Sequence, residues 1–241
     1  MLHRSWASTD IGTVRAHNED AVLARDDAGL WAVADGAGGH SAGEVASGML
    51  RDALAAIPAN LPGGAMLNAV RTDVAAVHEA LLAEAQRRGP DTIIASTLVV
   101  LMIRDGSFAC LWAGDSRAYL LRDGALQQIT RDHTLVQELV DAGTITTAEA
   151  EMHPQANVII RAIGGGEADQ TLDKVSGALA PGDRFLLCSD GISKALDDAL
   201  LARLLAEPAP DPSRRVIEAA LAAHARDNIS AVVVDVLGAA R

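Results

Sequence analysis

Hydrophobic side chains along this chain gather into short runs that are separated by polar and glycine-containing segments. The runs are rich in β-forming residues, and they are either continuous or alternate with a period of two, as β-strands do. This pattern predicts strands at 29–34, 93–103, 107–113, 117–121, 184–188 and 230–236. The predicted strands come in groups, with longer segments of another pattern between the groups.

Two Asp-Gly dipeptides lie between neighbouring strand runs. Asp105-Gly106 separates 93–103 from 107–113, and Asp123-Gly124 follows 117–121 and precedes a short apolar segment at 126–129. Asp-Gly supplies the positive φ angles that a two-residue hairpin turn needs. Both dipeptides therefore predict hairpins, and hairpins imply antiparallel pairing.

Segments rich in alanine and leucine with helical periodicity lie between the strand groups, at about 41–57, 64–88 and 212–226. Ser41 and Glu44 have the spacing of a capping box, which predicts the start of the first helix. The order of these elements predicts an α+β fold, in which paired helices cover antiparallel sheets, rather than a strict βαβ alternation.

The stretch 132–165 interrupts the strand series with a helical pattern and few apolar runs. We interpret it as an insert that lies over the domain and not as a second domain. The connector Pro208-Ala-Pro-Asp-Pro212 is too short for an interdomain linker. The sequence therefore predicts a single domain across residues 1–241.

Composition narrows the classes of partner. Of the 241 residues, 49% are hydrophobic, which is enough for a sizeable core, but only 2% are aromatic, so Ala, Val, Leu and Ile must fill most of it. The formal charge of −12 repels nucleic-acid phosphates and argues against DNA or RNA as a partner. The same charge would oppose a phosphate-bearing substrate unless cations offset it locally.

Cys110 and Cys188 both lie inside apolar runs, without a Cys-x-x-Cys neighbour or a histidine at ligand spacing. A buried, inert thiol is the preferred interpretation over a reactive thiol or a disulfide. The N-terminus has no apolar signal-peptide core, and no stretch approaches the roughly 18–20 apolar residues of a membrane helix. We therefore expect a soluble, cytoplasmic protein without a membrane partner.

Carboxylates follow apolar runs at separate places in the chain. Asp35 and Asp190 end predicted strands, Asp115 and Asp227 follow apolar segments, and Glu19-Asp20 lies near the N-terminus. Any one of these aspartates is explained as a turn or cap residue. Together, converging strand ends would form a patch of negative charge that stays ionised only with a cation. Oxygen ligands without His or Cys suit Mg²⁺ or Mn²⁺ better than zinc, and from spacing alone both interpretations stay open.

Five short motifs occur in a suggestive order. They are Arg15-Ala-His-Asn-Glu-Asp20, Val33-Ala-Asp-Gly-Ala-Gly-Gly-His40, Ala113-Gly-Asp-Ser-Arg117, Cys188-Ser-Asp-Gly191 and Asp227-Asn-Ile-Ser230. In this order, they resemble the metal-dependent protein phosphatases, the type 2C serine/threonine phosphatases, and particularly their bacterial branch. Segments 130–133 and 160–164 are also similar to the family, so the resemblance extends from about Ser8 to Val236.

The resemblance implies two stacked antiparallel β-sheets flanked by helix pairs, a four-layer α-β-β-α sandwich, with a small helical flap at about 132–165. It implies two or three Mn²⁺ or Mg²⁺ ions. Asp35 would bridge two of them, and Asp190 and Asp227 would complete the shell of one. The Gly36 carbonyl, with Glu19 acting through water, would serve the other.

Further roles follow from the resemblance alone. A weaker third metal matches Asp115 and Asp190, and Arg15 matches the arginine that binds substrate phosphate. Some family members have a histidine directly after the Asp-Gly, where this chain has Ala37. His40 matches the bacterial pattern, but we interpret it as a structural residue at a helix start, and the general acid stays open.

The function implied is hydrolysis of phosphoserine and phosphothreonine in proteins by direct attack of a water or hydroxide that bridges the metals. The partners implied are phosphorylated proteins and a bacterial Ser/Thr kinase that the enzyme opposes, and a monomer is expected. Two alternatives remain: a catalytically silent relative that binds a phosphoprotein, and an enzyme for another phosphomonoester such as a small metabolite. We also expect Asn228, Ser230, Ser116, Arg117 and His133 to be structural.

Overall fold

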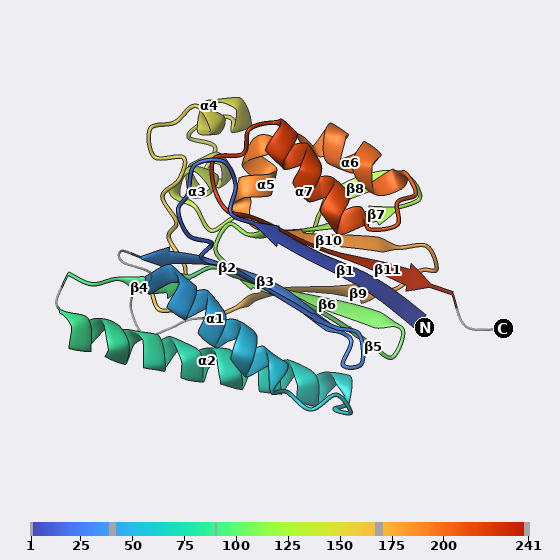
Figure 1. Ribbon diagram of the computed structural model, residues 1–241, viewed down its shortest axis with the longest axis horizontal. Helices are drawn as coiled ribbons and strands as arrows, with labels where there is room; N and C mark the ends of the chain where they lie inside the picture. The colour runs from blue at the N-terminus through green and yellow to red at the C-terminus, as the bar shows by residue number, and fades with distance from the viewer. Residues whose placement is uncertain (1, 39–41, 90, 167–170, 239–241) are drawn as a thin grey trace.

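The computed structural model describes residues 2–38, 42–89, 91–166 and 171–238, and two antiparallel sheets stack at its centre (Figure 1). Sheet I has the spatial order β1 (Leu2–Asp10), β11 (Ile229–Leu237), β10 (Arg184–Cys188), β7 (Arg117–Arg122) and β8 (Ala125–Gln128). Sheet II has the order β2 (Asp20–Arg25), β3 (Leu30–Gly38), β5 (Leu98–Arg104), β6 (Ser107–Ala113) and β9 (Asp173–Ala178), and β4 (Ile94–Ser96) also pairs with β3.

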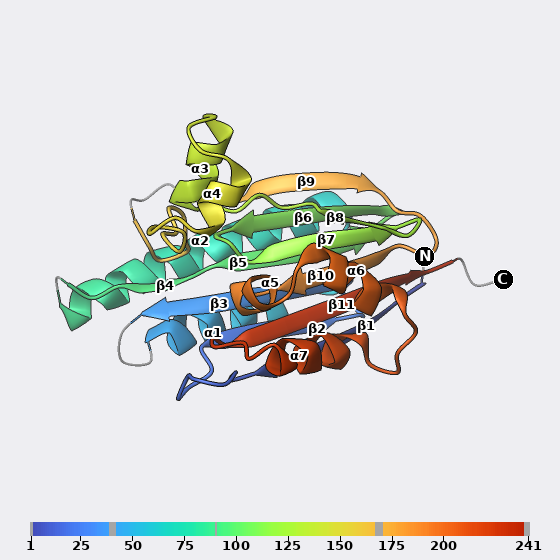
Figure 2. The same cartoon turned by 90° about the horizontal axis from the view of Figure 1, so that it is seen from above.

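Helices cover the outer faces of both sheets. Helices α1 (Ala42–Ala55) and α2 (Gly63–Arg88) lie against sheet II, and α5 (Asp190–Ala195), α6 (Asp198–Ala206) and α7 (Pro212–Ala222) lie against sheet I (Figures 1 and 2). The short helices α3 (Leu135–Asp141) and α4 (Thr147–Glu151) project from one end. The order of layers is helix, sheet, sheet, helix, which confirms the α+β sandwich.

Three apolar clusters hold these layers together. The cluster between the sheets contains Trp31, Phe108, Trp112 and Phe185 together with aliphatic side chains. A second cluster packs α1 and α2 on sheet II, and a third packs α5, α6 and α7 on sheet I. Burying apolar area at about 25 cal/mol per Å² is the main source of stability in such a sandwich.

Both predicted hairpins are present. Arg104 pairs with Ser107 across Asp105-Gly106, and Asp105 and Gly106 have φ angles of 50° and 75°. The second turn repeats this geometry, since Asp123 and Gly124 have φ angles of 51° and 80°. The positive φ at both central positions is that of a type I′ turn.

The sequence-based prediction was wrong about several elements. The run 93–103 is broken between β4 and β5 at Thr97, which bonds to Asp35 instead of continuing a strand. Strands β1, β2 and β9 were not predicted, and the last predicted helix ends at Ala222 rather than near 226. Helices α5 and α6 were also missed, because six and nine residues give little periodicity.

The expectation for the two cysteines is confirmed. Cys110 and Cys188 are free and buried, and burial raises the pKa of the Cys188 thiol to about 12. No helix in the described ranges is long and apolar enough to cross a lipid bilayer. The predicted cap at Ser41 and the residue His40 lie outside the described residues.

Candidate metal centre and active site

Two aspartates on neighbouring strands form the centre of the candidate site. Asp20 begins β2, Asp35 lies in β3, and the antiparallel register sets them directly opposite each other. Burial raises the pKa of Asp20 to about 7, and the negative charge of Asp190 raises it further. Hydrogen bonds from Ser230 and Ser189 act in the opposite direction and lower that pKa. The pKa of Asp35 is raised well above its usual range by burial and then by the charge of Asp20. Like charges opposite each other destabilise a strand pair, so this pair is costly unless a cation compensates it.

Three further carboxylates reach the same place from distant parts of the chain. Asp115 lies in the turn between β6 and β7, Asp190 is the first residue of α5, and Asp227 precedes β11. Their negative charges all raise the pKa of Asp35, which shows that they act on one another electrostatically. Burial also raises the pKa of Asp115 to about 7, and the charge of Asp190 adds to the rise.

Several carboxylate oxygens in this cluster are buried without a hydrogen-bond donor. Within the described residues, Asp20 Oδ1, Asp115 Oδ1 and Asp190 Oδ1 have no such partner. An unsatisfied buried acceptor costs about 1–3 kcal/mol, and more when it is charged. Oxygens of this kind are what Mg²⁺ and Mn²⁺ accept as ligands, so the donor set fits hard divalent cations.

The carboxylates are nevertheless not arranged as a closed cage. No group of three or more acidic, histidine or cysteine side chains in the described part of the chain has the mutual geometry of a finished metal site. Arg15 Nη2 instead pairs with Asp227 Oδ2 at 2.7 Å, and Lys194 Nζ pairs with Asp190 Oδ2. The case for a metal centre therefore rests on the shared charge and the unpaired oxygens.

The backbone beside Asp35 is packed very closely. A Cβ on Gly36 would lie 2.1 Å from the Gly43 carbonyl oxygen and 2.6 Å from the Glu19 carbonyl oxygen. A Cβ on Gly43 would lie 2.7 Å from the Gly36 carbonyl oxygen and 2.9 Å from Glu19 Cδ. The Gly36 carbonyl and the Glu19 carboxylate are therefore neighbours, and only glycine fits at either position.

The residues at the break between β4 and β5 hold Asp35 in place. Thr97 N donates to the Asp35 carbonyl at 2.9 Å, and Asp35 N donates to Thr97 Oγ1 at 3.2 Å. Ser96 Oγ also donates to the Asp35 carbonyl, at 3.0 Å, and Ser116 Oγ lies 2.6 Å from Thr97 Oγ1. Ser116 thus positions Thr97, which in turn holds Asp35, as expected for a structural residue.

Asn228 organises the opposite side of the cluster. Its backbone N donates to Asp227 Oδ1 at 2.9 Å, and its side-chain Oδ1 accepts from Glu19 N at 2.9 Å. Its Nδ2 donates to the carbonyls of Ile11 and His17, at 2.9 and 3.0 Å. One buried amide therefore ties the segment that carries Arg15 and Glu19 to the start of β11.

Other residues predicted to be structural also have structural partners. His133 Nδ1 accepts from Gly114 N at 3.1 Å, and its Nε2 lies 3.2 Å from Asp173 Oδ2. Arg117 makes a double hydrogen bond to Asp132, with Nη2 to Oδ2 at 2.7 Å. Ser230 Oγ lies 2.8 Å from Thr9 Oγ1 and so fastens β11 to β1.

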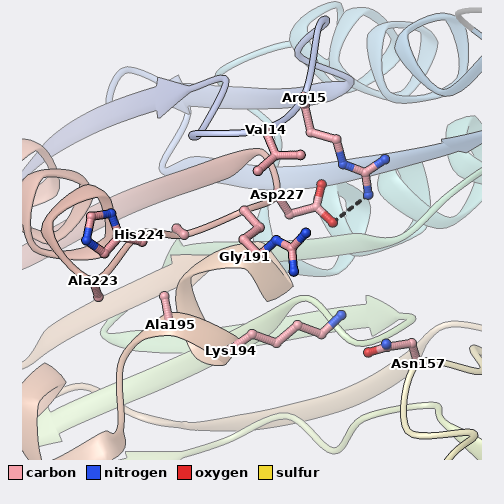
Figure 3. A pocket seen from close by; sticks show the side chains of 11 residues that line it. Val14, Arg15, Asn157, Gly191, Lys194, Ala195, Ala223, His224 and Asp227 are labelled. Carbon is pink, nitrogen blue, oxygen red and sulfur yellow. Dashed lines mark hydrogen bonds and ion pairs between the residues drawn. The ribbon is translucent and has the colours of Figure 1, made fainter.

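A cleft of about 500 Å³ opens beside the carboxylates. Arg15 enters it from the β1–β2 loop, Lys194 from α5, and Asn157 from the insert at 132–165 (Figure 3). The Arg15 guanidinium points to Asp227, and the Lys194 side chain extends toward Asn157. Cationic side chains and the carboxylate of Asp227 therefore line the same cleft.

Most predicted site residues are thus brought together. Asp35, Asp115, Asp190 and Asp227 share one cluster, Glu19 lies beside Gly36, and Arg15 lies at the rim. Ala37, where some relatives of the resembled family have histidine, is exposed in β3. Sequence reasoning named Asp20 as a candidate but gave it no role, and it did not single out Lys194.

Comparison with known proteins decides the family. A family model described as protein phosphatase 2C matches residues 13–231. The chain belongs to the protein phosphatase 2C family. Among curated relatives, the serine/threonine protein phosphatase PstP of Mycobacterium tuberculosis is 43% identical over 238 residues, which are 98% of this chain and 46% of PstP. The chain thus spans about half the length of that protein phosphatase 2C relative.

Other members of the protein phosphatase 2C family are similar over most of their own length. The serine/threonine phosphatase stp of Listeria monocytogenes is 33% identical over 204 residues, with 82% of this chain and 81% of that protein covered. PppA, a key regulatory component of the T6SS in Pseudomonas aeruginosa, has a structure with a TM-score of 0.90, 43% identity and 98% of each chain covered. The catalytic domain of PstP, solved with two manganese ions, has a TM-score of 0.87 and 41% identity, again with 98% of each chain covered. The predicted family and fold are confirmed.

Proposed function

We propose that this chain is a Mg²⁺- or Mn²⁺-dependent phosphatase that hydrolyses phosphoserine and phosphothreonine in proteins. The observation that carries the proposal is the cluster of buried carboxylates whose oxygens lack donors, beside a cleft that Arg15 and Asp227 line. The two manganese ions in the solved PstP domain support the choice of metal.

The family resemblance supports an assignment of the residues that would hold the ions. Asp35 would bridge two ions, with Asp190 and Asp227 on one, and the Gly36 carbonyl and Glu19 through water on the other. Asp115 and Asp190 would hold a third ion more weakly. When bound, such ions acidify water and neutralise the charge that develops on phosphorus during in-line displacement.

The chain itself would supply binding and orientation. Arg15 has a planar fork that suits two phosphate oxygens, and its side chain is 54% exposed at the cleft. Asp20 Oδ2 accepts from Ser189 Oγ at 2.8 Å, which leaves Oδ1 free to accept a hydrogen bond from the attacking water. The free oxygen would orient that water toward the phosphorus.

The remaining parts of the chain also have proposed roles. The insert at 132–165 would be a flap that influences substrate choice, since Asn157 lines the cleft. Residues 1–241 would form one catalytic domain. We infer that its partners are phosphoproteins and a Ser/Thr kinase whose products it removes, and the likeness to PstP and PppA supports this role.

The test is release of phosphate from a phosphothreonine peptide with manganese, by the wild type and by Asp35→Asn and Asp190→Asn. Wild type should turn over, and both variants should lose at least a hundredfold in kcat/KM, while Asp91→Asn, an exposed carboxylate, should not change. A folded wild type that binds manganese but hydrolyses no phosphopeptide would refute the proposal. Hydrolysis of phosphometabolites alone would point to another phosphomonoesterase.

A further inference from the structure

The wall of the cleft differs in charge from the rest of the protein. The chain has 20 Lys and Arg against 32 Asp and Glu, yet the cleft is lined by Arg15, Lys194, Arg226 and His224, with Asp227 as the one acidic lining residue. A cleft lined by positive charge focuses the electric field and raises the local concentration of anions.

The positively charged residues that line the cleft differ in whether they form ion pairs within the protein. Arg15 is paired with Asp227 and Lys194 with Asp190, which are both carboxylates proposed to hold metal ions. Arg226 is exposed and makes no ion pair with any residue in the described ranges. The Arg226 guanidinium can therefore pair with an anion of a bound substrate without first breaking an ion pair within the described residues.

The segment that carries Arg226 is held firmly. The carbonyl of the preceding residue, Ala225, accepts from Thr13 N at 3.0 Å and from Thr13 Oγ1 at 2.9 Å. The following residue, Asp227, packs so closely on Gly12 that a Cβ there would lie 2.0 Å from the Asp227 carbonyl oxygen. The backbone on both sides of Arg226 is thus held next to Asp227, one of the clustered carboxylates.

The size of the cleft also exceeds what one phosphate needs. Its volume of about 500 Å³ lies in the range of pockets that hold drug-sized molecules, which are much larger than a phosphate. It extends from Arg15 past the α7–β11 loop to Lys194 and Asn157 (Figure 3). A phosphorylated side chain bound at Arg15 would leave room in it for a neighbouring side chain of the same peptide.

We propose that this cleft is a subsite for a second anionic group of the substrate, with Arg226 as its principal contact and Lys194 as a second one. The anion would be a carboxylate or a second phosphate on a residue close in sequence to the phosphoresidue. The inference rests on the proposed phosphatase function and specifies its substrate class: acidic or doubly phosphorylated peptides are preferred over neutral ones.

The test uses peptides with a single phosphothreonine in a neutral background and one glutamate placed in turn at each of the four positions on either side. A further set carries a second phosphothreonine instead of the glutamate, which distinguishes the two sources of negative charge. The quantity measured for each enzyme is the ratio of kcat/KM for the charged peptide to that for the neutral peptide. Expressing the preference as a ratio removes any change in turnover common to all substrates.

For the wild type, glutamate at one or two positions should raise the ratio to about three to five, as expected for one exposed ion pair, and a second phosphate should raise it further. The ratio should fall to about one in Arg226→Gln, fall below one in Arg226→Glu, and recover in Arg226→Lys. Higher salt should weaken the preference, because exposed charges are screened.

Arg214→Gln is the matched control, since Arg214 is an exposed arginine on α7 that pairs with Glu218 outside the cleft. This variant should keep the wild-type ratio. A wild-type ratio of one at every position, or an unchanged ratio in Arg226→Glu, would overturn the subsite while phosphothreonine hydrolysis itself persists. If no peptide is hydrolysed at all, the phosphatase proposal is the one that fails.

Discussion

Replacing Asp20 with asparagine should stabilise the metal-free protein. Asp20 lies opposite Asp35 in the β2–β3 ladder, and burial raises its pKa to about 7. The folded state therefore holds a proton on Asp20 at pH values where the unfolded chain has already released it. Asparagine keeps the shape and can still bond to Ser189, but it carries no charge.

The sign and size of the effect follow from that pKa. Because the folded-state pKa lies above the unfolded value of 3.8, the wild type loses stability as the pH rises from about 4 to about 7. The loss is about 1.4 kcal/mol per pH unit and reaches at most about 4 kcal/mol above pH 7. Neighbouring carboxylates share this cost, so a gain of about 2–4 kcal/mol is expected for Asp20→Asn at pH 8, and a much smaller gain at pH 5.

Urea unfolding in EDTA at pH 5 and pH 8 measures this gain, with Asp91→Asn as a control that should change stability by less than about 0.5 kcal/mol. Added manganese should then stabilise the wild type more than the variant, because the ion relieves the repulsion that the variant has already lost. An Asp20→Asn protein that is no more stable than the wild type at pH 8 would refute the electrostatic argument.

Gly191→Ala, with Gly48→Ala as its control, tests the packing around the site. Asp183→Asn tests a buried ion pair in sheet I, away from the site. Gly191→Ala would place a Cβ 2.1 Å from the Asn228 carbonyl oxygen, so it should cost about 1–3 kcal/mol and lower manganese affinity at least tenfold by calorimetry. Gly48→Ala, which meets nothing within 4 Å, should instead be neutral or stabilising, and equal losses in the two variants would contradict the packing argument. Asp183→Asn should cost about 2–3 kcal/mol at pH 7, because Arg122 binds that fully buried carboxylate at 2.6 Å. Burial raises the pKa of Asp183, but the hydrogen bonds from Arg122 outweigh it and the pKa is lowered. This stabilisation is fully present above the unfolded pKa of about 4 and is lost as the pH falls through the lower folded pKa, so urea unfolding at pH 3 should show a smaller difference. An equal loss at pH 3 and pH 7 would exclude the charge as the cause.

The interior of the fold was predictable because interior strands are apolar on both faces. Strands β5, β6, β10 and β11 are continuous hydrophobic runs, and they were found. Strands β1, β2 and β9 lie at sheet edges, where half the positions face solvent and short polar sequences such as that of β9 give no clear period. Edge strands are stabilised by pairing with a neighbour, which a local pattern does not reveal.

The site was predictable where a carboxylate follows a strong apolar run, as Asp35 and Asp190 do, although β3 continues past Asp35 to Gly38. Asp20 could not be assigned a role, because its position opposite Asp35 depends on the register of β2, which was not predicted. The break at Thr97 was also hidden, since its backbone and side chain bond to Asp35, a residue 62 positions away. Long-range hydrogen bonds of this kind override a local β pattern.

The pairing of β1 with β11 constrains the order in which the molecule can be assembled. Residues 2 and 237 are register partners, and β11 inserts between β1 and β10. During synthesis, β1 must therefore wait with an open edge until the last strand of the sheet has left the ribosome. Asp227 lies two residues before that strand, so a nascent chain cannot complete the carboxylate cluster until the sheet closes.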